Sequence, residues 1–140
     1  MERHTIVVGH APAAGGRLAL SRAIEEARLR GSRLLVVPSM PGGRRTGLDE
    51  VEVSCRALEE AEARLKAEGV DYAVRELVRG KTPARDLADL AAEEKADLLV
   101  IGYCHRSKSG KYFLGSDAQD IVLAAPCPVL ATRPPEGEED

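Results

Sequence analysis

Tryptophan is absent from this 140-residue sequence, and aromatic residues make up only 3% of it. A hydrophobic core must therefore be built from aliphatic side chains, which dominate the 44% hydrophobic content. A hydrophobic content this high beside 31% charged residues is the composition of a folded globular protein and not of a disordered chain. A chain of this length predicts one domain that buries roughly two-thirds of its unfolded surface.

Other absences exclude classes of function. The formal net charge of −3 argues against nucleic acid and anionic membranes as partners, since both select a basic face. No apolar run approaches the ~20 residues of a membrane span, and no signal peptide precedes Thr5, so we expect a cytoplasmic protein. The three cysteines show no CxxC spacing, which argues against a disulfide framework or a structural zinc site of that type.

Short apolar runs recur along the chain and predict five strands. They are Thr5–Gly9, Arg33–Val37, Tyr72–Val78, Leu98–Gly102 and Pro128–Thr132. The runs in the first, second and fourth are continuous, as in strands buried on both faces of a parallel sheet. Tyr72–Val78 alternates in polarity, so we expect it at an edge of the sheet.

Segments of helical period separate the strands. We expect helices over Ala14–Arg30, from Leu48 to a stop at Gly69, from Thr82-Pro83 onward, and from Ser116 to a stop at Pro126. Cys55 falls on the apolar face of the second helix and is expected in the core. With right-handed crossovers, this alternation predicts a single-domain α/β fold, an open doubly wound parallel sheet with helices on both faces.

The segment from Gly102 to Ser116 reads GYCHRSKSGKYFLGS and joins the fourth strand to the last helix. Backbone N–H groups of such a loop, together with the positive end of the following helix, attract anions such as a phosphate chain. Arg106, Lys108 and Lys111 could screen phosphates, although an exposed basic loop is the commoner meaning of such a run.

This segment resembles the signature of universal stress proteins, Gly-x2-Gly-x9-Gly-Ser/Thr. Gly102, Gly115 and Ser116 match it, and His105 stands where the second glycine belongs. IVVGHAPAAGGRLALSRAIEEA, GKTPARDLADLAAEEKADLLVIG and LGSDAQDIVLAAPCPVLATR are also similar to that family. The resemblance implies sheet order 3-2-1-4-5 over residues 1–133, with 134–140 as an acidic tail expected to be disordered. It also implies a homodimer through Val129–Thr132, whose backbone would otherwise be an open edge.

In the family, the ligand lies at the carboxyl ends of strands one and four, the switch point of a doubly wound sheet. The cofactor-binding residues expected here are Gly9, Ala11, Val37, Ile101, Gly102, Cys104, His105, Gly115, Ser116 and Asp117. Three of them depart from the ATP-binding pattern. Ala11 replaces an aspartate that contacts the nucleoside, His105 replaces a glycine and would be strained if that glycine needs positive φ, and Asp117 competes with phosphates for the helix N-terminus. We therefore expect binding of ATP with Mg²⁺ to be weak or lost.

The expected function is a non-enzymatic stress-response domain with an adenine-nucleotide crevice, because no nucleophile, base and orienting group can be assembled from the sequence. One alternative is a weak ATPase or autophosphorylating protein with Ser107, Ser109 or Ser116 as acceptor. Another is a sensor of a different small ligand such as cyclic AMP. A Zn²⁺ site of His10, Cys104 and His105 is a further alternative, but its spacing matches no established pattern, so we predict no metal site.

Overall fold

The computed structural model describes residues 4–10, 14–38, 48–76, 83–102, 104–106, 112–114 and 116–132. Helices in this part of the chain are α1 (Ala14–Arg30), α2 (Leu48–Glu68), α3 (Pro83–Glu93) and α4 (Ser116–Ala124). The main sheet contains β1 (Thr5–His10), β2 (Arg33–Pro38), β3 (Tyr72–Val74), β4 (Leu98–Ile101) and β7 (Val129–Ala131). A separate pair consists of β5 (Cys104–Arg106) and β6 (Tyr112–Leu114).

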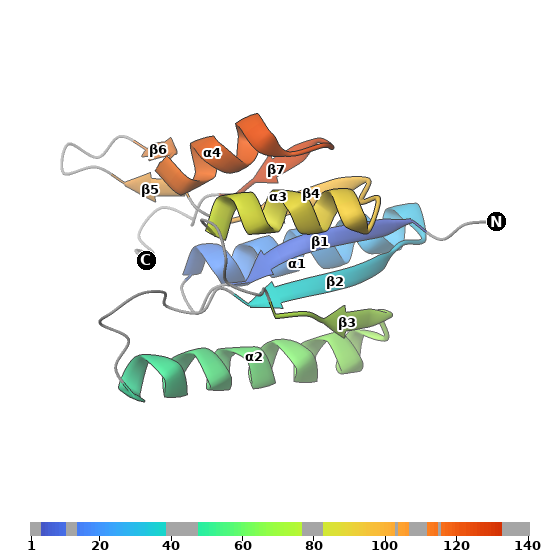
Figure 1. Cartoon of the computed structure of the whole chain (residues 1–140). Helices are drawn as coiled ribbons and strands as arrows, with labels where there is room; N and C mark the ends of the chain where they lie inside the picture. The colour runs from blue at the N-terminus through green and yellow to red at the C-terminus, as the bar shows by residue number, and fades with distance from the viewer. Residues whose placement is uncertain are drawn as a thin grey trace.

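The main sheet is parallel throughout, in the order β3-β2-β1-β4-β7, with β1 in the centre (Figure 1). β1 pairs with β2 from Thr5↔Arg33 to His10↔Pro38, and with β4 from Ile6↔Leu98 to Val8↔Val100. The predicted order 3-2-1-4-5 is thereby confirmed, with β7 as its fifth strand. All strands point the same way, so the sheet has one carboxyl edge and one amino edge.

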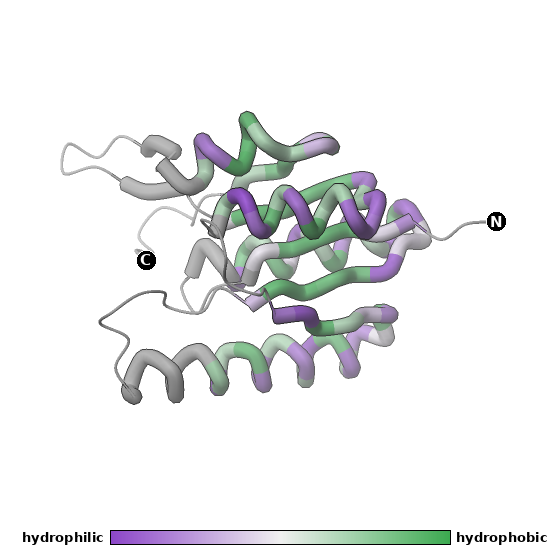
Figure 2. The backbone as a smooth tube through the Cα atoms, viewed as in Figure 1, coloured by the Kyte–Doolittle hydropathy of each residue, from purple (hydrophilic) through white to green (hydrophobic). Residues whose placement is uncertain are grey.

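Apolar side chains on the two faces of the sheet form two separate cores. On one face, Ile6 and Val8 pack with the inner sides of α1 and α2. On the other face, Val7 and Leu99 pack with α3 and α4. Figure 2 shows the strands as continuous hydrophobic segments in the middle of the molecule. The predicted burial on both faces is confirmed, and aliphatic side chains supply both cores.

Three helices end in the same way, with a left-handed residue followed by a hydrogen bond back to the residue five positions earlier. After α1, Gly31 has φ 64° and Ser32 N donates to Ala27 O over 2.9 Å. After α2, Gly69 has φ 70°. After α3, Lys95 has φ 52° and Ala96 N donates to Ala91 O over 2.9 Å. The first two stops were predicted, since glycine takes this conformation without strain, but the third is made by a lysine.

Two expectations about β3 and α2 need correction. β3 is an edge strand as predicted, but it ends at Val74; Arg75 and Glu76 lie outside it, and residues 77–78 lie outside the described part of the chain. Cys55 is exposed, so its expected place in the core is wrong. At 21 residues α2 is about 31 Å long, and its first turns extend beyond the short strand β3 that it accompanies (Figure 1).

The β5–β6 pair was not predicted. It is antiparallel, with Cys104 opposite Leu114 and Arg106 opposite Tyr112, inside the segment expected to be a loop. Residues 133–140 lie outside the described residues, so the domain boundary at residue 133 and the acidic tail stay predictions. Within the described ranges, no helix is both long enough and apolar enough to cross a membrane.

Candidate functional site

The carboxyl ends of β1 and β4 lie side by side at the centre of the sheet. Gly9 of β1 is the register partner of Val37 in β2, and Gly9 and Ile101 each follow the last pair between β1 and β4. Gly9, Val37, Ile101 and Gly102 are all buried. The structure therefore brings these four predicted residues together at one edge of the sheet.

The chain leaves β1 and β4 toward opposite faces of the sheet. α1, which follows β1, packs on one face, and α4, which follows the β5–β6 pair, packs on the other. The strand ends separate at this switch point, where doubly wound sheets bind ligands. Val37 and Ile101 belong to the core under α3 and α4, so their side chains pack against these helices at this edge of the sheet.

The β5–β6 pair leads from this edge to the start of α4. His105 lies opposite Phe113 in the pair, β6 contacts α4, and α4 begins at Ser116. Lys95 is the only non-glycine residue with positive φ among the described residues, so His105 does not have the backbone strain considered above. The N–H groups of the first turn of α4 remain the main-chain donors that the sequence indicated for an anion.

Other predicted site residues are not placed. Ala11 and Gly115 lie outside the described residues, and for Cys104, His105, Ser116 and Asp117 only the backbone is described. No three metal-binding side chains cluster among those that the structure describes. The side chains of His10, Cys104 and His105 are not among them, so that zinc site stays untested.

The amino edge of the sheet carries a charged cavity that the sequence did not lead us to expect. Its volume is about 670 Å³. It is lined by His4, Thr5, Arg33, Asp71, Glu94, Lys95 and Asp97. The sequence contained an indication of this cavity, because a charged or ionisable residue stands at or just before the start of four strands. These residues are His4, Arg33, Asp71 and Asp97. Amino ends of parallel strands meet at one edge, so these four residues had to gather there.

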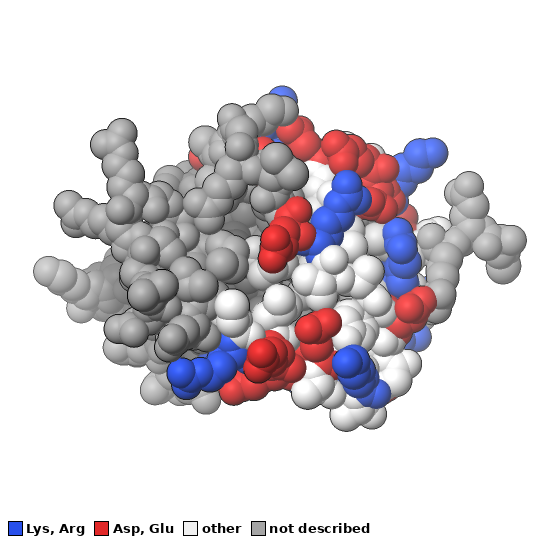
Figure 3. Space-filling view, turned by 60° about the horizontal axis from the view of Figure 1, so that its bottom comes forward, with Lys and Arg blue, Asp and Glu red and all other residues white. Residues whose placement is uncertain are grey.

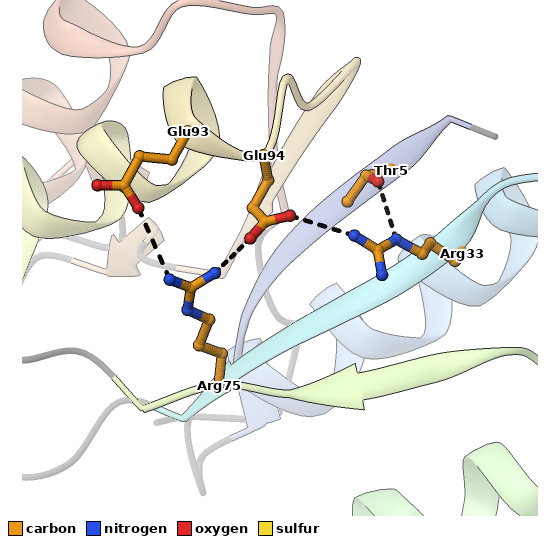
Figure 4. Close-up of polar contacts among 5 residues, drawn as sticks. All are labelled: Thr5, Arg33, Arg75, Glu93 and Glu94. Carbon is orange, nitrogen blue, oxygen red and sulfur yellow. Dashed lines mark hydrogen bonds and ion pairs between the residues drawn. The ribbon is translucent and has the colours of Figure 1, made fainter. Parts of the chain in front are cut away.

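Glu94 is the centre of the polar contacts at this edge (Figure 4). One of its carboxylate oxygens accepts from Arg33 Nη2 over 3.1 Å, and the other is bound by Arg75. Arg33 Nε also donates to Thr5 Oγ1 over 3.1 Å, and Arg75 reaches Glu93 at 3.7 Å. The network joins the end of α3 to the starts of β1 and β2 and to the residue after β3.

A second pair lies beside this network. His4 Nδ1 is 2.5 Å from Asp97 Oδ2, which joins the residues that precede β1 and β4. Burial raises the pKa of the Cys127 thiol, and the negative charge of Asp97 raises it further. Cys127 packs partly against the core beneath α3 and α4.

The strand order and the helices on both faces of the sheet define the class of this molecule as a single-domain, doubly wound α/β protein. The profile of the universal stress protein family matches residues 2–133, and the chain belongs to that family.

Three comparisons illustrate the relationship. The universal stress protein of Mycolicibacterium smegmatis is 37% identical over 129 residues, which cover 92% of this chain and 97% of the relative. The structure of a universal stress protein from Archaeoglobus fulgidus is 37% identical with a TM-score of 0.74, covering 94% of this chain and 98% of that one. A structure of the universal stress protein from Archaeoglobus fulgidus in complex with dAMP is 35% identical with a TM-score of 0.68, over the same shares.

Proposed function

We propose that this chain is a non-enzymatic stress-response domain that takes an adenine nucleotide at the carboxyl ends of β1 and β4. The observation that carries the proposal is the switch point of the sheet, where Gly9 and Gly102 lie near the carboxyl ends of neighbouring strands and the chain then leads to the start of α4. A relative of 35% identity was solved in complex with dAMP, which supports an adenine nucleotide as the ligand class. Main-chain N–H groups at the helix start would hold its phosphates.

We propose that this nucleotide binds weakly, including ATP with Mg²⁺. Ala11 offers no carboxylate to a ribose hydroxyl, and a charge-assisted hydrogen bond of that kind is worth about 1.5–3 kcal/mol, or one to two decades in affinity. Asp117 adds a negative charge in the first turn of α4, where phosphates would bind. Gly102, Gly115 and Ser116 retain the main-chain part of the site.

Calorimetry with Mg-ATP, ATP and dAMP tests this proposal. The unmodified protein should bind each ligand weakly or below detection, while Ala11→Asp, His105→Gly and Asp117→Val combined should bind measurably. Sub-micromolar binding by the unmodified protein would contradict the weak site. No gain in the triple variant would show that the crevice is built differently from that of nucleotide-binding relatives.

The enzymatic alternative is tested with the same protein. Release of phosphate from ATP, or transfer of labelled phosphate to Ser107, Ser109 or Ser116, should be absent. Cyclic AMP belongs in the calorimetric series as the competing small ligand. Binding of cyclic AMP much tighter than that of dAMP would replace the proposed ligand.

We also propose a homodimer through Val129–Thr132. β7 pairs with β4 on one side only, and its other row of backbone groups has no strand partner among the described residues. Antiparallel pairing about a two-fold axis perpendicular to the sheet would bring the α4 helices of both copies onto the same face. Val122 and Leu123 on α4 are 46% and 85% exposed, and this pairing would cover them.

Two matched leucines test the dimer. Leu29 on α1 is 81% exposed and lies on the opposite face from α4, so Leu29→Asp is the control for Leu123→Asp. Light scattering should report about twice the chain mass of 15.0 kDa for the unmodified protein and for Leu29→Asp. Leu123→Asp should shift the equilibrium toward the monomer. A monomeric unmodified protein at micromolar concentration would refute the proposal.

The domain is proposed to span residues 1–133, with 134–140 as an acidic extension beyond it, in the cytoplasm. Cys55 and Cys127 are free thiols, which suits a reducing compartment. Limited proteolysis followed by mass spectrometry should leave a core that ends near residue 133.

A further inference from the structure

The amino-edge cavity lies at the opposite end of the strands from the nucleotide crevice, where α3 has ended and the amino ends of β1 and β2 project beyond it. Its volume of about 670 Å³ is within the usual range of small-molecule sites. Every described residue that lines it is polar or charged. The lining exposes more polar than apolar surface, which favours a small and highly polar ligand.

Charges of both signs surround the cavity. Arg33 and Lys95 contribute cations, and Asp71, Glu94 and Asp97 contribute carboxylates. Figure 3 shows the same mixture over the described part of one face of the molecule, where basic and acidic side chains are interspersed. A polyanion such as a nucleotide triphosphate would meet the three carboxylates, and a simple cation would meet Arg33 and Lys95.

Most of these charges already have partners. Glu94 is bound by Arg33 and Arg75, and Asp97 by His4 (Figure 4 for Glu94). Lys95 differs, because no hydrogen bond or ion pair of its ammonium group is recorded with any described residue, and because it is exposed. Arg33 binds Thr5 and Glu94 through Nε and Nη2, so its other N–H groups can still donate.

The backbone of Lys95 is the second unusual feature. Its φ of 52° is left-handed, in the position where α1 and α2 are followed by Gly31 and Gly69. A lysine there is less stable than glycine, and strained residues of this kind are found at functional sites more often than elsewhere. The left-handed stop after α3 thus places at the cavity a lysine whose ammonium group has no partner among the described residues, at the expense of stability.

We propose that the amino-edge cavity binds a small zwitterion of the amino-acid class. Lys95 and the free N–H groups of Arg33 hold the carboxylate of the ligand. The carboxylates of Asp71 and Asp97 each have a partner already, but a carboxylate accepts several hydrogen bonds, so both can also attract the ammonium group of the ligand. A ligand with both charges matches a lining with both charges, and the site works independently of the nucleotide crevice.

Two-dimensional ¹⁵N–¹H NMR titration with L-glutamine tests the proposal. Butyrate and butylamine serve as matched ligands that carry only one of the two charges. L-glutamine should give saturable shifts of the Thr5, Arg33 and Asp97 amides at concentrations up to about 50 mM, while either single-charge ligand should bind at least about tenfold more weakly.

Lys95→Gly is the decisive variant, because relief of the strained φ should raise its melting temperature while it loses L-glutamine binding by about tenfold or more. Lys95→Arg should keep most of the binding. Lys66→Ala removes an exposed cation near the end of α2 and should change neither property. No saturable shift, equal binding by Lys95→Gly, or butyrate binding as tight as that of L-glutamine would each overturn the proposal.

Discussion

At the carboxyl edge of the sheet the groups brought together belong to the main chain, whereas at the amino edge they are charged side chains. Gly9 and Gly102 are buried near the carboxyl ends of β1 and β4, and the proposed anion donors are the N–H groups in the first turn of α4. Arg33 begins β2, whereas Glu94 and Asp97 lie in the connection between α3 and β4, so Arg33 meets the two carboxylates only in the folded protein. A main-chain site is specified by a short motif with fixed spacing, and a side-chain site by the topology of the whole sheet.

The largest loss of stability is expected from a substitution in the core beneath the carboxyl edge of the sheet. The side chain of Ile101 is 0% exposed and packs in the core beneath α3 and α4. Ile101→Ala should lower the free energy of unfolding by about 2–5 kcal/mol, because it leaves a cavity there. Urea denaturation at neutral pH measures the change. A loss below about 1 kcal/mol would show that the end of β4 can repack around the smaller side chain, so that the carboxyl edge would not depend on this core.

A substitution that breaks the polar network at the amino edge should lower the free energy of unfolding by a smaller amount. Glu94→Gln removes the charge shared by Arg33 and Arg75, and we expect a loss of about 1 kcal/mol in the free energy of unfolding. The loss should shrink in about 1 M NaCl, since the three side chains are partly exposed. Glu59→Gln on the exposed side of α2 is the control and should have almost no effect. A loss that does not depend on salt would indicate packing rather than charge.

Substitutions at the residues that end the helices should change the free energy of unfolding in opposite directions. Lys95→Gly should raise the free energy of unfolding by about 0.5–1 kcal/mol, because glycine adopts positive φ without strain. Gly31→Ala and Gly69→Ala should lower it by about 1 kcal/mol each. A Cβ atom would meet nothing within 4 Å at either glycine, so backbone strain alone would account for the loss. Destabilisation by Lys95→Gly would mean that the lysine side chain stabilises the fold.

The smallest expected effect is on the reactivity of the Cys127 thiol. Burial and the charge of Asp97 raise the pKa of its thiol above the ordinary 9.0, so less thiolate forms at a given pH. In a Cys104→Ser background, Cys127 should react with a thiolate-specific disulfide reagent about tenfold more slowly than the exposed Cys55 at about pH 8.

The pH dependence of stability follows from the same shift. A thiol with a raised folded-state pKa contributes stability below the unfolded-state pKa. That contribution is lost as the pH rises above 9.0 toward the folded-state value. Urea denaturation across this pH range measures the effect. The free energy of unfolding of Cys127→Ser should fall less at high pH than that of the unmodified protein.

Much of the fold could be predicted from local pattern. The apolar runs at Thr5 and Leu98, the glycine stops at Gly31 and Gly69, and Pro83 at the start of α3 are signals confined to a few residues. The β5–β6 pair could not be read in the same way, because His105 and Phe113 belong to a segment whose glycines and small polar residues indicated a loop. Cys55 fits a helical period, but the period does not show where the sheet beneath the helix ends.

The two candidate sites also differ in how far the sequence could predict them. Gly9, Val37, Ile101 and Gly102 were predicted from the family resemblance and the switch-point rule, and the structure brings them together. The amino-edge cavity could be predicted only with knowledge of the strand order. The contact between Arg33 and Glu94 joins residues that no motif connects.

The central position of β1 also has a kinetic consequence. Ile6 in β1 pairs with Leu98 in β4, and most of the chain has to be synthesised between them. At roughly 5–20 residues per second, β1 would wait several seconds on the ribosome with one side unpaired. During that time its apolar Ile-Val-Val sequence is an open edge available to other chains. Refolding should be governed by the β1–β4 contact and be slow relative to helix formation, and losses to aggregation should arise before that contact forms.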